Sequence, residues 1–430
     1  MLVVPLTLPS APLRMTEIFS SVHVSGPSAP LRTGSSDPLT TSESTEIKTS
    51  PVDVIESFRG KKVFITGHTG FKGSWLTLLL SNAGAILKGY ALAPDGENAL
   101  YSYLEPDLKI DSVIADIRDA ANLRDAITTF EPDFVFHLAA QPLVRYSYTA
   151  PVETFEVNVM GTVHLLEALR HLPNKCTAVI VTTDKVYENN ESGVPFKETD
   201  PLGGHDPYSS SKAACEIVVA SYLKSYFSVG VDVSELAVAS RQSAVASQQS
   251  AVGSRQLPVI GIATARAGNV IGGGDWAKDR IIPDLVAALE SGNTLQVRNP
   301  GAVRPWQHVL DPLFGYLQLA MLLHNDPEKY SGSYNFGPNP EDQLTVNEIV
   351  ELALKSWGSG TYIASPPSDA PHEAAHLRLD ISKAKTELGW EPKWNATTAV
   401  ERTVEWYKNI LGKSSNKFES CMKDINAFMN

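Results

Sequence analysis

Tyr208 and Lys212, four residues apart, are the side chains in this sequence best suited to proton transfer. Residues at this spacing lie on one face of a helix, so the ammonium group can lie beneath the phenol. Because a phenol has a pKa near ~10, a tyrosine that acts as a base at neutral pH needs positive charge close by. An exposed helix start after Pro207 would show the same spacing, so this pair alone leaves its function open.

A second chemical cluster, Thr183-Asp184-Lys185, precedes Tyr208 by 25 residues at the end of an apolar run. Loss of water next to an oxidised carbon requires one group that removes a carbon-bound proton and another that protonates the departing hydroxyl. We assign Asp184 as the general acid, with simple pairing to Lys185 as the alternative. Lys185 would act as a base only if burial or positive neighbours lowered its pKa from ~10.4.

A glycine-rich turn follows the strand expected at 61–67. Gly67, Gly70 and Gly73 form a GxxGxxG run that opens a helix. Such a turn lets backbone N–H groups and the positive end of the helix dipole approach a pyrophosphate. We therefore assign Gly67, Gly70, Phe71, Lys72 and Gly73 to dinucleotide binding, with a plain turn as the alternative. The bulk of His68 is expected to crowd the adenosine side and weaken cofactor retention.

The elements around these motifs alternate between strands and helices. Strands are expected at 61–67, 87–93, 133–140, 178–183 and 259–265, with helices at 74–84, 123–130, 159–172 and 209–227. This order predicts an α/β fold with a Rossmann-type doubly wound parallel sheet. From about Gly272 helices and irregular segments dominate, which predicts a smaller, mostly helical C-terminal substrate domain. The cleft between the two is the expected ligand site.

Composition divides the chain further. Residues 1–55 are rich in Ser, Thr and Pro and are expected to be a disordered tail, with a transit peptide as the alternative. Residues 56–271 would form the cofactor domain, interrupted by tandem heptads at 237–257 that resemble a solvated loop more than a coiled coil. Residues 272–412 would bind substrate, with some interleaving of the chain, and 413–430 would be a C-terminal extension.

The net charge of −12 and the pI near 5.4 argue against nucleic acid or an anionic membrane as a partner, so local groups must meet any anionic ligand. The sequence has no apolar run of the ~18 residues that a membrane span requires, so no membrane contact is expected. The three cysteines are too far apart for a metal site or a disulfide framework. We expect no metal and a cytoplasmic protein.

Long segments of the chain, such as HLAAQPLVRYSY, DPLGGHDPYSSSK and ARAGNVIGGGDWAKDR, resemble the CDP-glucose 4,6-dehydratases. These enzymes belong to the NAD-dependent epimerase/dehydratase family of extended short-chain dehydrogenases/reductases. Thr183, Tyr208 and Lys212 resemble the catalytic triad of that family. Thr183-Asp184-Lys185 resembles the CDP-glucose version, whereas dTDP-glucose 4,6-dehydratases carry Thr-Asp-Glu. The resemblance covers roughly residues 60–407.

The resemblance implies further site residues. Those beside the cofactor are Asp116, Ile117, Leu138, Ala139 and Ala140, and those toward the nucleotide-sugar substrate are Gln141, Arg145, Asn269, Arg304 and His308. Helix capping is the alternative for Asp116, a surface ion pair for Arg304 and a buried core position for His308.

The resemblance also implies NAD as cofactor, CDP-D-glucose as substrate and a homo-oligomer, a dimer or tetramer paired through helices. The product would be CDP-4-dehydro-6-deoxy-D-glucose, a precursor for deoxysugars such as those of lipopolysaccharide O-antigen. Another nucleotide-sugar 4,6-dehydratase, a 4-epimerase and a non-catalytic NAD-sensing scaffold are the competing interpretations.

Overall fold

Seven parallel strands form the central sheet of the computed structural model, which describes residues 50–227, 259–364, 376–414 and 416–430. The strand order is β11-β6-β5-β4-β1-β2-β3. The strands are β1 (Lys62–Thr66), β2 (Ile86–Ala91), β3 (Ile110–Ile114), β4 (Phe134–His137), β5 (Cys176–Val181), β6 (Ile260–Ala267) and β11 (Gly332–Phe336). The reversal between β1 and β4 is the switch point of a doubly wound fold.

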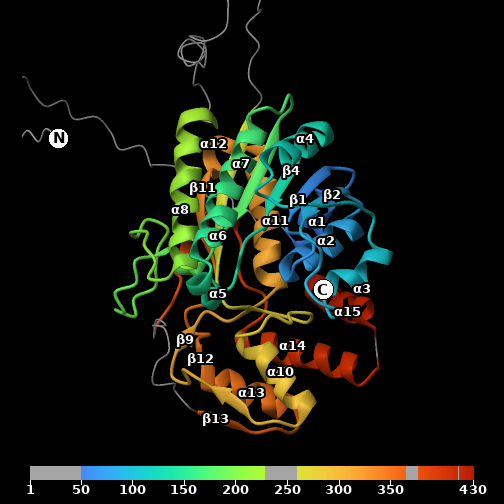
Figure 1. The fold of residues 1–430 in the computed structure, drawn as a ribbon, viewed down its shortest axis with the longest axis vertical. Helices are drawn as coiled ribbons and strands as arrows, with labels where there is room; N and C mark the ends of the chain where they lie inside the picture. Colours follow the sequence, from blue (N-terminus) through green and yellow to red (C-terminus); the bar gives the residue numbers. More distant parts are fainter. Residues whose placement is uncertain (1–49, 228–258, 365–375, 415) are drawn as a thin grey trace, which may run out of the picture. The chain divides into compact units, whose positions relative to one another are not determined.

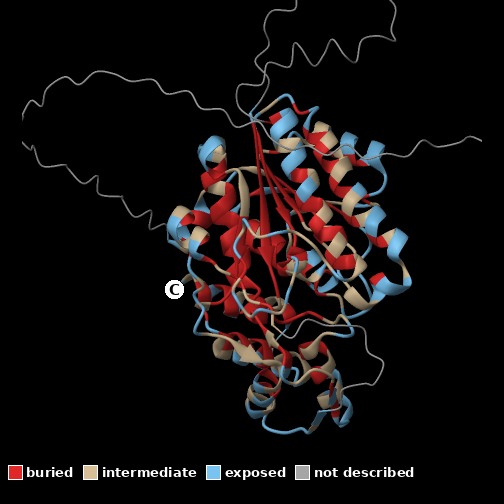
Figure 2. Ribbon diagram, turned by 90° about the vertical axis from the view of Figure 1, so that its left-hand side faces the viewer, coloured by how far each residue is buried: buried red, intermediate tan, exposed pale blue. Residues whose placement is uncertain are grey.

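Both faces of the sheet are covered by helices, as Figure 2 shows from the buried strands between two helical layers. In β1, Val63 and Ile65 join one apolar core and Phe64 joins the other, as the period of a strand requires. The first core contains residues of α1 (Pro51–Glu56), α2 (Phe71–Ala83) and α11 (Leu310–Asn325), and the second contains residues of α4 (Ala120–Phe130), α7 (Gly161–Leu169) and the C-terminal part of α8 (Pro207–Tyr222). The predicted fold class is confirmed.

A smaller region follows β6 and lies below the sheet in Figure 1. The chain ends in α15 (Lys417–Met429), which packs on α14, while the region's own helices are α10 (Ile281–Ser291), α13 (Val346–Trp357) and α14 (Ala396–Leu411). Its short strands pair as β8 (Leu295–Val297) with β13 (Tyr362–Ala364), β9 (Val303–Arg304) with β12 (Leu344–Thr345), and β7 (Val270–Ile271) with β10 (Gln307–His308). Between these segments α11 and β11 return to the large sheet. The described residues all belong to one compact unit, Glu46–Asn430.

The tail that we predicted at residues 1–55 is too long, because its last residues form α1. Ser50 caps this helix through a capping box with Asp53, while Val54 and Ile55 are buried. The packed part of the chain therefore begins with α1, which lies against α2 and α11, about five residues earlier than the composition suggested. The rest of that segment, residues 1–49, and the heptads at 237–257 lie outside the described residues. Among the residues that are described, no helix is long and apolar enough to cross a bilayer.

The glycine run Gly272-Gly273-Gly274 lies where several elements meet. A Cβ atom on Gly273 would lie 2.1 Å from the Trp406 ring of α14, and the Gly273 carbonyl accepts a hydrogen bond from Trp75 of α2 at 2.9 Å. Gly274 has φ of +86° and lies against Leu100. No larger residue fits at Gly273 without moving a buried tryptophan.

We therefore predict that Gly273→Ala destabilises the fold by about 1–3 kcal/mol through overpacking. The matched control is Gly301→Ala, because a Cβ atom there meets no heavy atom within 4 Å. Thermal and urea unfolding would measure both variants. Equal stability of the two would contradict the packing assigned to Gly273.

Candidate active site

A cavity of about 1260 Å³ opens where the large sheet ends. Its lining includes a residue just beyond the carboxyl end of each of six strands: Gly67, Leu92, Ala115, Leu138, Thr182 and Gly268. Ligands of open α/β sheets bind at this edge. The volume exceeds the usual ~300–1,000 Å³ of a site for one small molecule, which suits a dinucleotide together with a second ligand.

The glycine turn forms one end of this cavity. Gly67 has φ of +74°, and a Cβ atom there would lie 2.6 Å from the backbone nitrogen of Ala139. A Cβ atom on Gly73 would lie 2.1 Å from the Gly67 carbonyl oxygen. A Cβ atom on Gly70, at the start of α2, would meet only the Gly67 carbonyl oxygen at 3.5 Å, and Gly70 lines the cavity, so a pyrophosphate could approach the first N–H groups of the helix. The backbone of this turn fits a dinucleotide.

His68 does not crowd this site, contrary to our expectation. Its ring is fully buried, turned away from the cavity, and packs against Tyr101 at 5.0 Å between ring centroids. His68 Nε2 lies 2.7 Å from the hydroxyl of Ser112, and a Cβ atom on Gly89 would overlap the ring. Burial lowers the pKa of His68 to about 4, so the ring is neutral. The histidine is a packing residue between β1, β2 and β3.

The residues expected beside the cofactor all line the cavity. Leu138, Ala139 and Ala140 form one wall, and Phe71, Lys72, Asp116 and Ile117 contribute elsewhere. Asp116 is not a helix cap, because Asp119 caps α4. The Asp116 carboxylate instead pairs with Arg118 at 2.6 Å, and this pair holds the pKa of Asp116 below its usual value.

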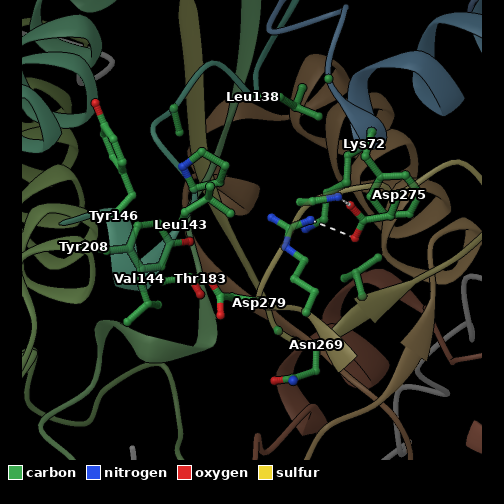
Figure 3. A pocket seen from close by; sticks show the side chains of 18 of the residues that line it. Lys72, Leu138, Leu143, Val144, Tyr146, Thr183, Tyr208, Asn269, Asp275 and Asp279 are labelled. Atoms are coloured by element: carbon green, nitrogen blue, oxygen red, sulfur yellow. Dashed lines mark hydrogen bonds and ion pairs between the residues drawn. The ribbon is translucent and has the colours of Figure 1, made fainter. Parts of the chain in front are cut away.

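Thr183, Tyr208 and Lys212 come together on the opposite wall, where Figure 3 shows Thr183 beside Tyr208. Burial raises the pKa of Tyr208 to about 12, opposed by a hydrogen bond with Thr183 and by the charge of Arg280. Lys212 donates to the Val181 carbonyl at 3.1 Å, and burial lowers its pKa. The three side chains predicted as a triad therefore line the same cavity, with Thr183 bonded to Tyr208 and Lys212 held at the end of β5.

Asp184 lies directly behind this wall and is fully buried, so it does not line the cavity. Its Oδ1 accepts hydrogen bonds from the Thr183 hydroxyl at 2.9 Å and from Lys185 Nζ at 3.1 Å. Its Oδ2 is buried without a hydrogen-bond partner among the described residues and lies against Gly268, where a Cβ atom would overlap it. Lys185 lines the cavity.

Arg280 is the site residue that the sequence interpretation missed. It lines the cavity from the loop after β7, pairs with Asp275 at 2.8 Å, and its charge acts on both Tyr208 and Lys72. Figure 3 shows Lys72 and Asp275 on the wall facing Tyr208. Burial, aided by Arg280, lowers the pKa of Lys72 to about 7. The signal was present in the string GGGDWAKDR, where a basic residue follows a glycine turn.

The substrate-side residues divide into two groups. Arg145, Asn269 and Arg304 line the cavity, with Asn269 in the left-handed region at φ of +43°. Gln141 does not, because its side chain bonds the Leu143 N–H at 2.6 Å and the Thr154 hydroxyl at 2.9 Å.

His308 also lies outside the cavity, so the expectation of substrate contact is not met. It is fully buried between Trp75 and Trp394, with ring centroids at 6.0 and 4.8 Å. Burial lowers its pKa to about 3. The buried core position, which we kept open as the alternative, is the one that the structure has.

Comparison with known proteins decides the family. The chain is 45% identical over 351 residues to a CDP-glucose 4,6-dehydratase from Salmonella typhimurium, covering 82% of this chain and 91% of that protein. The chain belongs to the CDP-glucose 4,6-dehydratase family. A dTDP-glucose 4,6-dehydratase from Streptomyces antibioticus is 30% identical over 70% of this chain and 78% of its own length. A family model described as GDP-mannose 4,6 dehydratase matches residues 64–244.

Solved structures share the fold. A dTDP-glucose 4,6-dehydratase from Streptomyces venezuelae, crystallised with NAD, has a TM-score of 0.65 at 24% identity and covers 82% of this chain and 98% of its own. A UDP-glucose 4-epimerase from Thermotoga maritima, crystallised with UDP-glucose, has a TM-score of 0.64 at 22% identity and covers 81% and 99%. Because dehydratases and epimerases share this architecture, the side chains at the site must distinguish them.

Removing the charge of Arg280 should shift the pH dependence of the CDP-glucose 4,6-dehydratase reaction. The guanidinium stabilises the phenolate of Tyr208 and so lowers its pKa. In Arg280→Gln that pKa should rise, and the ascending limb of the kcat/KM–pH profile should move about 0.5–1 unit to higher pH. Arg280→Lys, which keeps the charge, should leave the limb nearer its original position. An unmoved limb in Arg280→Gln would exclude the coupling.

Proposed function

We propose that this protein converts CDP-D-glucose to CDP-4-dehydro-6-deoxy-D-glucose and water. The observation that carries the proposal is the placement of Asp184 and Lys185 directly beside the hydroxyl of Thr183 and the phenol of Tyr208. An acid and an amine at this position serve an elimination, which neither a simple oxidation nor a 4-epimerisation needs. Membership of the CDP-glucose 4,6-dehydratase family supports the same reaction.

The cofactor assigned to the glycine turn is NAD, held by the backbone of Gly67, Gly70 and Gly73 and walled by Leu138 and Ala139. When bound there, NAD supplies the acceptor for the hydrogen of sugar C4 and later the donor of hydrogen to C6. We assign cofactor binding to residues 56–271 and substrate binding mainly to 272–412. The remaining steps are carried out by side chains of this protein.

Tyr208 acts first, as the base that removes the proton of the C4 hydroxyl. Thr183 orients the reacting oxygen through its hydrogen bond with Tyr208. Arg280 is the cation that favours the ionised form of this phenol against the effect of burial, and Lys212, held by the Val181 carbonyl, is assigned to positioning. Oxidation at C4 makes the C5 proton acidic, which prepares the elimination.

Elimination then requires an acid at the C6 hydroxyl and a base at C5. Asp184 lies behind the cavity wall, so its proton would reach the leaving hydroxyl through the hydroxyl of Thr183, which lines the cavity and is hydrogen-bonded to Asp184 Oδ1 at 2.9 Å, and water then departs. Lys185 is our candidate for the group that removes the C5 proton, after transfer of its own proton to the adjacent Asp184. This exchange along the 3.1 Å contact would leave a neutral amine and a protonated acid, the two forms that elimination needs.

The substrate diphosphate is assigned to the basic side of the cavity. Arg304 is buried and lines the cavity together with Asn269 and Arg145. A guanidinium offers a planar fork of donors that matches phosphate oxygens. These local cations allow a protein of net charge −12 to bind two anionic ligands.

Two competing interpretations fit the observations less well. A 4-epimerase would have the same fold but would leave Asp184 and Lys185 without a chemical role. A non-catalytic NAD-sensing scaffold would not need Thr183, Tyr208 and Lys212 to meet at the cavity. Analysis of the sugar product separates the first, and any turnover removes the second.

The direct test is incubation of the purified protein with CDP-D-glucose and NAD. We expect a 4-ketosugar, measured by its absorbance after alkali, and a mass loss of one water. UDP-glucose, dTDP-glucose and GDP-mannose serve as comparison substrates. Turnover of one of these in preference to CDP-glucose would change the assigned substrate, and a 4-epimer as product would change the reaction.

Asp184→Asn should slow elimination by about a hundredfold or more, because an amide cannot protonate the leaving hydroxyl. Single-turnover absorbance of the reduced cofactor would show whether oxidation at C4 persists. The melting temperature and the affinity for NAD provide the control for folding. An equal slowing of oxidation and elimination would contradict the role assigned to Asp184.

We also propose a cytoplasmic homo-oligomer, a dimer or tetramer. All three cysteines are buried free thiols, as suits a reducing compartment. Apolar side chains that are exposed along α6 (Pro151–Phe155), the adjoining π-helix Glu156–Met160 and α8 are Val152, Phe155, Met160 and Ile217. These contiguous helices offer a pairing surface.

Ile217→Asp should therefore weaken association and give monomers in light scattering coupled to gel filtration. A charge at the centre of an apolar interface loses its hydration on pairing, which disfavours the oligomer. Ile363→Asp is the matched control, because that exposed isoleucine lies on β13, away from these helices. A monomeric wild-type protein, or equal effects of both substitutions, would reject this interface.

A further inference from the structure

Helix α15 lies beyond the part of the chain that carries the resemblance, yet it is firmly packed. Cys421, Ile425 and Phe428 belong to the main apolar core, and the Phe428 ring stacks on Phe314 with centroids 4.8 Å apart. Figure 1 shows α15 beside α3 (Leu100–Leu104) and α14, next to the cofactor half of the sheet. The helix is therefore part of the fold and can influence what it touches.

Its first residue, Lys417, is in an unusual position. A cation at a helix N-terminus faces the positive end of the helix dipole, which disfavours it. Lys417 is nonetheless buried, with Nζ 3.2 Å from the centroid of the Tyr103 ring and 5.7 Å from that of Trp276. It also donates to the Asn98 carbonyl at 3.2 Å. Two aromatic faces and a carbonyl thus offset the cost of placing the charge there.

Trp276 connects this lysine to the active site. Its side chain lines both the main cavity and a second cavity of about 260 Å³, which Lys417 and Tyr103 also line. The Trp276 ring meets Tyr407 of α14 edge-on at 5.1 Å, and the Tyr407 hydroxyl donates to the backbone carbonyl of Asp275. Trp276 therefore lies between the C-terminal helices and the loop that enters the cavity.

Asp275 completes the connection. Its carboxylate pairs with Arg280 at 2.8 Å and accepts a hydrogen bond from the Ala277 N–H at 3.2 Å. Arg280 in turn acts on the phenol of Tyr208. From Lys417 to Arg280, each step is a direct contact between neighbouring groups. The start of the same loop is already fixed by the close packing of Gly273 against Trp406.

We propose that Lys417 is a positioning residue, which through its cation–π contact with Trp276 holds the loop 272–280, and with it Arg280, at the reaction centre. The C-terminal extension then completes the active site from outside the sheet and the substrate region. Burial lowers the pKa of Lys417 to about 8, so the charged form that the contact needs predominates at pH 7. The kinetic part of this inference rests on the proposed function, whereas the structural part does not.

The structural test is hydrogen–deuterium exchange of the full-length protein, read by mass spectrometry. Lys417→Met keeps the length of the side chain and removes its charge, so exchange in peptides covering 272–280 should become faster. Lys417→Arg should restore slow exchange. Lys423→Met is the matched control on the same helix, because Lys423 pairs only with exposed Glu405 in the described structure and lies away from Trp276. Faster exchange spread evenly over all peptides, or none at 272–280, would overturn the proposal.

The kinetic test uses CDP-glucose and the same three variants. Loss of the cation–π contact should lower kcat/KM about three- to tenfold in Lys417→Met and move the ascending limb of its pH profile to higher pH, because Arg280 would be less well placed to lower the pKa of Tyr208. Lys417→Arg should recover most of the loss, and Lys423→Met should match wild type. An unchanged kcat/KM and an unchanged pH profile in Lys417→Met would overturn the proposal. If wild type does not act on CDP-glucose, the proposed function fails, and exchange at 272–280 still decides the role of Lys417.

Discussion

The buried ion pair between Glu216 and Arg266 holds the catalytic helix on the sheet. Glu216 lies one turn beyond Lys212 and two turns beyond Tyr208 on α8. Its carboxylate accepts hydrogen bonds from Arg266 and Thr264 of β6 and from Thr182 at the end of β5. Removing one partner of such a pair leaves an uncompensated buried charge, typically at a cost of about 3–5 kcal/mol. The phenol and ammonium on α8 are thereby held at the strand end that carries Thr183 and Asp184.

Burial and neighbouring charges have opposing effects on the pKa values of ionisable side chains in the cavity. Burial disfavours the charged forms of Tyr208, Lys72 and Lys212 alike. Arg280 partly reverses this effect for the phenol but reinforces it for the ammonium of Lys72. Anionic ligands would add negative charge among these cations and would therefore favour the charged forms of the lysines. The cavity thus suits anionic ligands although the protein as a whole is acidic.

The loop from Gly272 to Arg280 is where parts of the chain far apart in sequence meet. Trp75 of α2 and Trp406 of α14 hold its first residues, and Trp276 contacts α14 and the start of α15. An arginine on a loop held from several sides loses little conformational freedom when it meets a ligand. The smaller region and the C-terminal helices therefore support the same active site as the large sheet.

Local sequence determined the elements whose chemistry depends on near neighbours. The spacing of Tyr208 and Lys212 places both on one helix face, and the glycines at 67, 70 and 73 form the turn between β1 and α2, because these geometries are set within a few residues. The alternation of strands and helices likewise determined the parallel sheet.

Tertiary structure decided the direction of single side chains. His68 turns inward because Gly89 and Ser112, on neighbouring strands, leave room and a hydrogen-bond partner for it. His308 lies between Trp75 and Trp394, and Arg280 reaches Tyr208, through packing between segments more than 70 residues apart. Such contacts leave no periodic pattern along the chain, so only the folded arrangement could separate the residues that face the cavity from those that support it.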